Sequence, residues 1–157
     1  MPVSASQQID GNYRTITSNE AFLTSSQWTF AALTTGATGA HTVFTVTGDV
    51  IVGVFGSCQT NVTGAGTLEV GIAGNTAALV GQVTGTDIDA GMAFNLDGDL
   101  GGLVPLSASG EWQFILANGA DIIATVGTDT LTAGVVTYYC MWRPLSSTGR
   151  VAVTTPA

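Results

Sequence analysis

Short apolar segments separated by Gly, Asp and Asn recur along the chain, and they decide its fold class. Strands of about four to eight residues have this pattern, because successive side chains of a strand point to opposite faces. Segment 66–73 is the clearest example, with Leu68, Val70 and Ile72 on one face. No segment repeats apolar residues at helical spacing over several turns, so we expect an all-β chain.

Two pairs of neighbouring segments predict β-hairpins. Their turns are Gly48-Asp49 and Asn118-Gly119, dipeptides that fit tight turns between antiparallel strands. The paired segments are 41–47 with 50–55, and 111–116 with 121–126. Further strands are expected at 77–83, near 92–96 and at 134–142.

The even spacing of strands and turns is typical of an antiparallel β-sandwich that is jelly-roll-like. Residues 1–28 are polar and show no strand periodicity, so we expect an extended N-terminal arm. Asn19 is a candidate cap for one short helical turn within this arm. The β-sandwich domain is then 29–146, and 147–157 form a C-terminal tail.

Two of the expected strands are apolar on both faces. In 50–55, Ile51 and Phe55 lie opposite three valines, and in 134–142, Tyr139 and Met141 lie opposite a second apolar set. A sandwich strand needs one apolar face for its own core, so a loop, the arm or another subunit must cover the second. We expect a symmetric homo-oligomer, a trimer by analogy with compact jelly rolls, with cover from within the chain as the alternative.

The charge balance excludes one class of partner. The chain has 11 acidic residues, three arginines and no lysine, which gives a formal net charge of −8. Nucleic-acid binding needs clustered Lys and Arg, so we expect no nucleic-acid partner. No apolar run reaches the length of a membrane span and no secretory signal is visible, so we expect no membrane partner.

Few residues are suited to catalysis. His41 is the only histidine and begins an apolar strand, and neither Cys58 nor Cys140 lies in a known motif. No G-x-S-x-G, phosphate-binding or zinc-binding pattern is present. We therefore expect no enzyme, no cofactor and no catalytic or metal-ligating residues. His41 is interpreted as a strand-end or interface residue, and the cysteines as reduced, buried thiols.

Four acids in the irregular region 84–110 form the one candidate cation site: Asp87, Asp89, Asp97 and Asp99. Calcium takes several oxygen ligands from such loops, and paired carboxylates also serve glycosidases. The spaced third acid and the closing Glu of an EF-hand loop are both missing. We interpret these acids as solvated loop residues, with calcium binding as the alternative.

Three segments together resemble small structural proteins of tailed bacteriophages: GAHTVFTVTGDVIVGVFG, TLEVGIAGNTAALVGQVTGTDIDAG and ILANGADIIATVGTDTLTAGVVTYYCMWRPLS. The nearest role in that group is that of a capsid decoration, or cement, protein, and the resemblance covers roughly residues 35–150. It implies β-sandwich subunits, often trimers, that bridge neighbouring major capsid protein subunits on the virion surface. Such virions are assembled in the host cytoplasm. A tail, neck or fibre-associated virion protein and a carbohydrate-binding or adhesive module are the alternatives.

Overall fold

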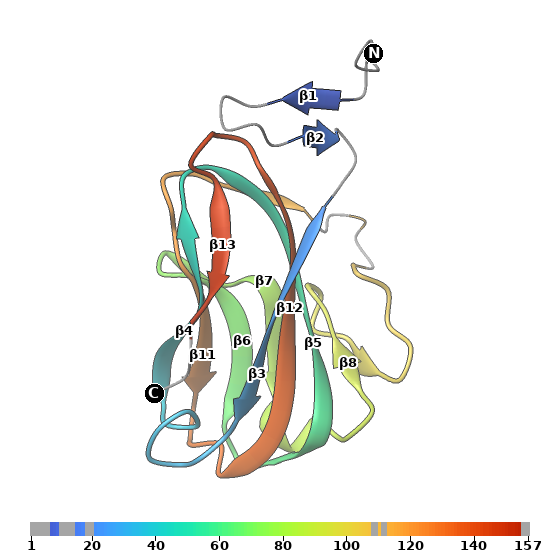
Figure 1. Cartoon of the computed structure of the whole chain (residues 1–157). Coiled ribbons are helices and arrows are strands. Elements are labelled where there is room, and N and C mark those ends of the chain that lie inside the picture. The colour runs from blue at the N-terminus through green and yellow to red at the C-terminus, as the bar shows by residue number, and fades with distance from the viewer. Residues whose placement is uncertain (1–6, 10–14, 18–20, 108–109, 111–112, 155–157) are drawn as a thin grey trace.

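The computed structural model describes residues 7–9, 15–17, 21–107, 110 and 113–154, and these are almost all strands and turns (Figure 1). The strands are β1 (Gln7–Ile9), β2 (Thr15–Thr17), β3 (Phe22–Thr29), β4 (Gly39–Thr47), β5 (Val50–Thr63), β6 (Thr67–Ile72), β7 (Asn75–Thr84), β8 (Ala93–Phe94), β9 (Leu100–Gly101), β10 (Phe114–Leu116), β11 (Ile122–Gly127), β12 (Ala133–Pro144) and β13 (Arg150–Val153). One 3-10 turn, η1, spans Gly85–Asp87. The prediction of an all-β chain is confirmed. Within these described ranges no helix has the length and apolarity needed to cross a membrane.

The strands of the main body form two antiparallel sheets. The six-stranded sheet has the order β3-β12-β5-β8-β9, and β10 also pairs with β5. The five-stranded sheet has the order β13-β4-β11-β6-β7, and the short strands β1 and β2 pair with each other. Figure 1 shows the two sheets as two layers, with β13, β4 and β11 in one and β3, β12 and β5 in the other.

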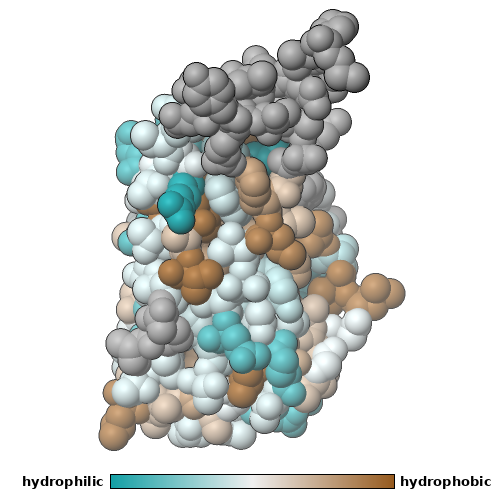
Figure 2. Space-filling model, in the orientation of Figure 1, coloured by the Kyte–Doolittle hydropathy of each residue, from teal (hydrophilic) through white to brown (hydrophobic). Residues whose placement is uncertain are grey.

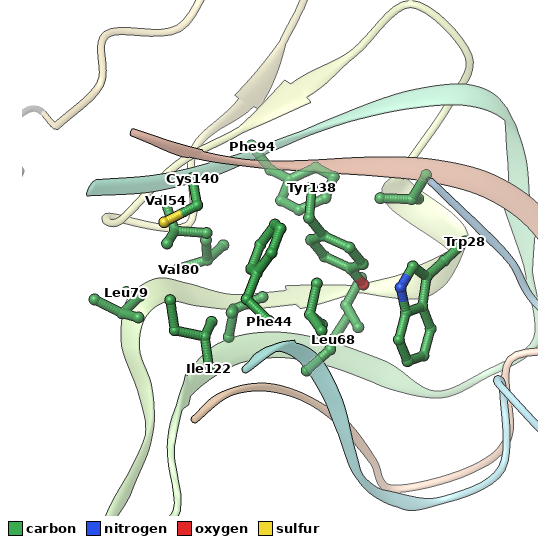
Figure 3. Close-up of a cluster of buried hydrophobic side chains, with 14 of the residues drawn as sticks. Trp28, Phe44, Val54, Leu68, Leu79, Val80, Phe94, Ile122, Tyr138 and Cys140 are labelled. Carbon is green, nitrogen blue, oxygen red and sulfur yellow. The ribbon is translucent and has the colours of Figure 1, made fainter. Parts of the chain in front are cut away.

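A single apolar core fills the space between the two sheets (Figure 3). Tyr138 of β12 lies at its centre, with Trp28 and Phe94 packed edge-on at centroid distances of 6.1 and 6.3 Å. The five-stranded sheet contributes Leu68 and Phe44, both fully buried. The alternation that predicted these strands therefore separates core residues from outward-facing ones.

The two expected hairpins are wrong, although their turns are in place. β4 and β5 flank Gly48-Asp49 but belong to different sheets, as do β10 and β11, which flank Asn118-Gly119. β4 pairs instead with β11, and β5 with β10, so the two turns lie side by side. The Gly119 N–H donates to the Gly48 carbonyl at 3.0 Å, and the Asn118 N–H donates to the Asp49 carboxylate at 2.9 Å. Each turn therefore carries the chain from one sheet to the other.

The expected arm of residues 1–28 ends earlier, because Phe22–Thr29 form the edge strand β3. Its inward side chains include Thr24 and Ser26, and because these are polar, the sequence of β3 shows no alternation of apolar and polar residues. Their hydroxyls accept hydrogen bonds from two indoles: Trp142 Nε1 donates to Thr24 at 2.9 Å, and Trp28 Nε1 donates to Ser26 at 3.0 Å. From Phe22 onward the expected helical turn near Asn19 is absent, because these residues form β3. Asn19 itself lies outside the described residues.

The expected tail of residues 147–157 also contains a strand. β13 adds to the edge of the five-stranded sheet by pairing with β4, and its Val151 side chain is buried in the core. A strand of four residues, with one buried side chain, carries too little alternation to be recognised in the sequence. The two sheets therefore extend beyond both ends of the range 29–146.

Candidate interaction surface

The outer face of the six-stranded sheet has an apolar half. Side chains of β3, β5, β10 and β12 that alternate with the buried core residues point away from the core here. We call this set the apolar half-face, and its members are Leu23, Ile51, Phe55, Ile115, Tyr139 and Met141. The expectation that β5 and β12 are apolar on both faces is confirmed.

Strand register places these side chains next to one another. Met141 lies opposite Leu23 of β3, and Tyr139 lies opposite Phe55 of β5. The rings of Phe55 and Tyr139 stack at a centroid distance of 5.1 Å and an interplanar angle of 15°. Ile115 lies opposite Ile51 at the β10 edge. The apolar half-face is thus one continuous patch across four strands.

The other half of this outer face is polar. Thr137 of β12 donates from its hydroxyl to Gln59 Oε1 at 2.9 Å, and Gln59 Nε2 donates to the Ser57 hydroxyl at 2.8 Å. Gln27 of β3 is exposed beside Thr137. Figure 2, in which the edge strands β3 and β13 lie toward the viewer, shows hydrophobic side chains near the upper part of β3 and a neutral and hydrophilic region below them. The apolar half-face therefore ends within the sheet, where Thr137 and Gln59 begin the polar half.

The five-stranded sheet differs, because its outer face is polar. Thr45 of β4 and Thr154 share a hydrogen bond at 3.0 Å, and Gln82 Nε2 of β7 donates to the Glu69 carboxylate of β6 at 3.1 Å. Threonine suits an outward position on a pleated sheet. Among the residues that the structure describes, only the outer face of the six-stranded sheet combines large apolar side chains from neighbouring strands.

The loop after β8 covers one border of the apolar half-face. Leu96 and Leu106 line a shallow hollow there with Gly53, Phe55 and Met141. Part of the second face of β5 and β12 is therefore covered from within the chain, as the alternative expectation proposed. Leu23 and Ile115 remain 62% and 70% exposed, so the cover is incomplete.

Asn95 holds this loop in shape, and it is fully buried. Its Oδ1 accepts from the N–H groups of Asp97 and Asp99, both at 3.0 Å. Its Nδ2 donates to the Pro105 carbonyl at 2.8 Å and to the Asp99 carboxylate at 3.2 Å. The Asn95 carbonyl accepts from Gly81 of β7 at 3.2 Å, which ties the loop to the other sheet.

The candidate cation site is not assembled. Asp87, Asp89, Asp97 and Asp99 are all exposed, and the described residues contain no group of three or more His, Cys, Asp or Glu that could hold a metal ion. An amide, that of Asn95, organises the 97–99 turn. The sequence interpretation overlooked Asn95. An Asn that lies two residues before Asp97 and four before Asp99 is a recognisable signal for a turn held by side-chain-to-backbone hydrogen bonds.

His41, Cys58 and Cys140 are packed within the fold. The His41 ring is half-buried, with Nε2 2.8 Å from the Ala37 carbonyl and its edge near Trp28, and it lies in the first part of β4 as expected. Both cysteines are free and buried in strands, in agreement with the prediction. Burial raises the pKa of Cys58 above its usual range and raises that of Cys140 to about 12, so neither thiol is activated for nucleophilic attack.

The tryptophans are the candidate sugar platforms of the chain. Trp28 lies in the core, and Trp112 lies outside the described residues. Trp142 stacks on Phe22 at a centroid distance of 4.7 Å, and the pair forms one wall of an open hollow of about 400 Å³. Ser147, Thr148, Gly149, Arg150 and Val151 line the rest of it.

No family model, no curated protein and no solved structure matches this chain in sequence or fold comparisons. We therefore infer the function from the chain's own surfaces.

Proposed function

We propose that this chain is a structural virion protein that decorates and stabilises a bacteriophage capsid by bridging major capsid protein subunits. The observation that carries the proposal is the apolar half-face, a large apolar surface outside the core that suits a subunit of a larger assembly. Such surfaces serve association with other protein. The sequence resemblance to tailed-phage structural proteins supports a phage virion as the assembly. The proposal therefore includes a location in the virion, which is assembled in the host cytoplasm.

The proposal includes a jelly-roll fold. Strand pairing is nested, because β3 pairs with β12, β4 with β11, β5 with β8, and β6 with β7. A long antiparallel hairpin that is rolled into two sheets pairs its strands in this order, which supports the assignment. Residues 1–21 would act as the arm that helps to anchor each subunit.

The proposed activity is mechanical and involves no reaction. Each subunit adds binding free energy to the assembled shell, because it binds the closed lattice and not the free capsid protein. A trimer would make the same contact three times, and the second and third contacts would form at high effective concentration. Weak individual contacts would thus give firm attachment.

Co-sedimentation tests the proposal. Capsids that lack the protein are incubated with increasing amounts of it, and free major capsid protein serves as the control. Saturable binding to shells, together with greater resistance of the shells to heat, is the expected result. Absence of binding to shells would refute the decoration role and favour a tail, neck or fibre position.

A carbohydrate-binding or adhesive role is the second candidate, and the hollow beside Phe22 favours it. This hollow combines an aromatic wall with the hydroxyls of Ser147 and Thr148 and the guanidinium side chain of Arg150. Aromatic rings, hydroxyls and a guanidinium are groups that suit a sugar ring with a carboxylate. Binding on a glycan array that Arg150→Ala abolishes would support this role over decoration.

A further inference from the structure

We infer that the apolar half-face is the surface through which copies of this chain meet in a closed homo-oligomer. This inference rests on the proposed function, in which the apolar half-face suits a subunit of a larger assembly, and it names the partner of that face. The occupant is another copy of the chain, and the capsid protein would bind elsewhere.

The size of the patch suits a subunit interface. At about 200 Å² for a fully exposed large side chain, Leu23 at 62% and Ile115 at 70% exposure present about 260 Å² of apolar surface. The half-buried members and Leu106 at the border raise the total to on the order of 500 Å². A standard interface buries about 800 Å² per partner, of which somewhat more than half is apolar. The patch therefore supplies the apolar part of one such interface.

The distribution of charge favours a second copy as the occupant. The chain carries a net charge of −8, so two copies repel each other when acidic surfaces meet. The six strands of the larger sheet contain no Asp or Glu, and their only charged residue is Arg143. Like charges that are brought together at an interface cost several kcal/mol. The strands of this sheet thus bring no carboxylate into a self-contact, and their one charged residue, Arg143, lies opposite Ile51 of the patch.

The patch is also rigid before association. Four of its members lie on the central, long strands β5 and β12, which pair over most of their length. Asn95 fixes the bordering loop through four side-chain hydrogen bonds. Little order therefore has to be gained on association, which lowers its entropic cost.

A paired set of variants tests the inference. Leu23→Asp combined with Ile115→Asp puts two carboxylates into the patch at exposed positions, where the monomer fold tolerates them. Leu33→Asp combined with Val153→Asp is the matched control, because both residues are exposed and lie outside the patch. The two double variants have the same net charge. Circular dichroism and melting temperature check that each is folded.

Light scattering and sedimentation velocity at about 10 µM measure the result. The wild type and the control should have a mass three times that of the 15.9 kDa chain. The patch variant should be a monomer, with association weakened about 100-fold or more. A dimer that the patch variant disrupts would uphold the interface and correct the copy number. A monomeric wild type, or an oligomer that the patch variant leaves intact, would overturn the inference.

Capsid binding separates this inference from the proposed function. A wild-type oligomer that depends on the patch but does not bind shells would refute decoration and leave the interface standing. A wild-type monomer that binds shells through the patch would make the capsid protein the occupant and refute self-association. The same double variants and co-sedimentation decide between these outcomes.

Discussion

Replacement of Asn95 by alanine tests how the loop beside the apolar half-face is held. The side chain is fully buried and makes four hydrogen bonds, two accepted from the N–H groups of Asp97 and Asp99 and two donated to Pro105 and Asp99. A hydrogen bond contributes about 0.5–1.5 kcal/mol net, and a buried donor left unpaired costs about 1–3 kcal/mol. Because the loop can open and return some groups to water, we expect Asn95→Ala to lower the free energy of unfolding by about 3 kcal/mol.

Urea unfolding followed by tryptophan fluorescence measures this loss, since Trp28 reports on the core. For a domain of this size 3 kcal/mol corresponds to a fall in melting temperature of about 6–12 °C. Hydrogen exchange should show faster exchange of the Asp97 and Asp99 amides than in the wild type. A loss under about 1 kcal/mol with unchanged exchange at these amides would refute the role assigned to Asn95.

Asn95→Asp separates the accepted hydrogen bonds from the donated ones. The carboxylate keeps the acceptor for the two amides but faces the Asp99 carboxylate and the Pro105 carbonyl without a proton to donate. Burial and the neighbouring charge would raise its pKa in the folded state above the unfolded value. Its protonated form is therefore favoured in the folded state, and the variant should lose stability relative to wild type as pH rises from acid to neutral.

Substitutions at three further positions test the core. Tyr138→Phe should be neutral or stabilise by about 1 kcal/mol, because the buried Tyr138 hydroxyl has no hydrogen-bond partner. A free energy of unfolding lowered by more than about 1 kcal/mol in urea would instead indicate that a bound water satisfies the hydroxyl. Ser26→Ala should destabilise by about 1–2 kcal/mol, since the buried Trp28 N–H loses its acceptor at 3.0 Å, and Ser26→Thr should lose less in the same unfolding assay. Burial raises the Cys140 pKa from 9.0 to about 12, so the stability that the neutral thiol contributes is complete below pH 9 and is lost between pH 9 and 12. Cys140→Ala should flatten alkaline unfolding in that window, and an unchanged profile would contradict this assignment.

The strands with strong apolar alternation could be predicted from the sequence, and so could the two-faced character of β5 and β12. Both follow from side-chain polarity along a single segment. The partners of those strands could not be predicted, because the same turn dipeptide serves a hairpin and a crossing between sheets. Gly48-Asp49 and Asn118-Gly119 are each turns, but the pairing of β4 with β11 depends on contacts far apart in the chain.

Residues that act through hydrogen bonds were the hardest to recognise. β3 places Thr24 and Ser26 toward the core because two indole N–H groups need acceptors there, and this need is invisible in a hydrophobicity pattern. Asn95 stands beside acids that draw attention away from it, since carboxylates suggest a cation more readily than an amide suggests a turn. The second apolar faces of β5 and β12, in contrast, depend on alternation alone and were expected from the sequence. Leu23 of the apolar half-face was not expected, because it lies in the range 1–28 that was predicted to be an arm.

Image reconstruction of capsids incubated with the protein is the most direct test of the proposal that this chain decorates a phage shell. The account predicts added density at repeated lattice positions, each spanning neighbouring capsid subunits and each fitted by copies of the two-sheet domain joined at the apolar half-face. Reconstructed shells with no added density at saturating protein would contradict it.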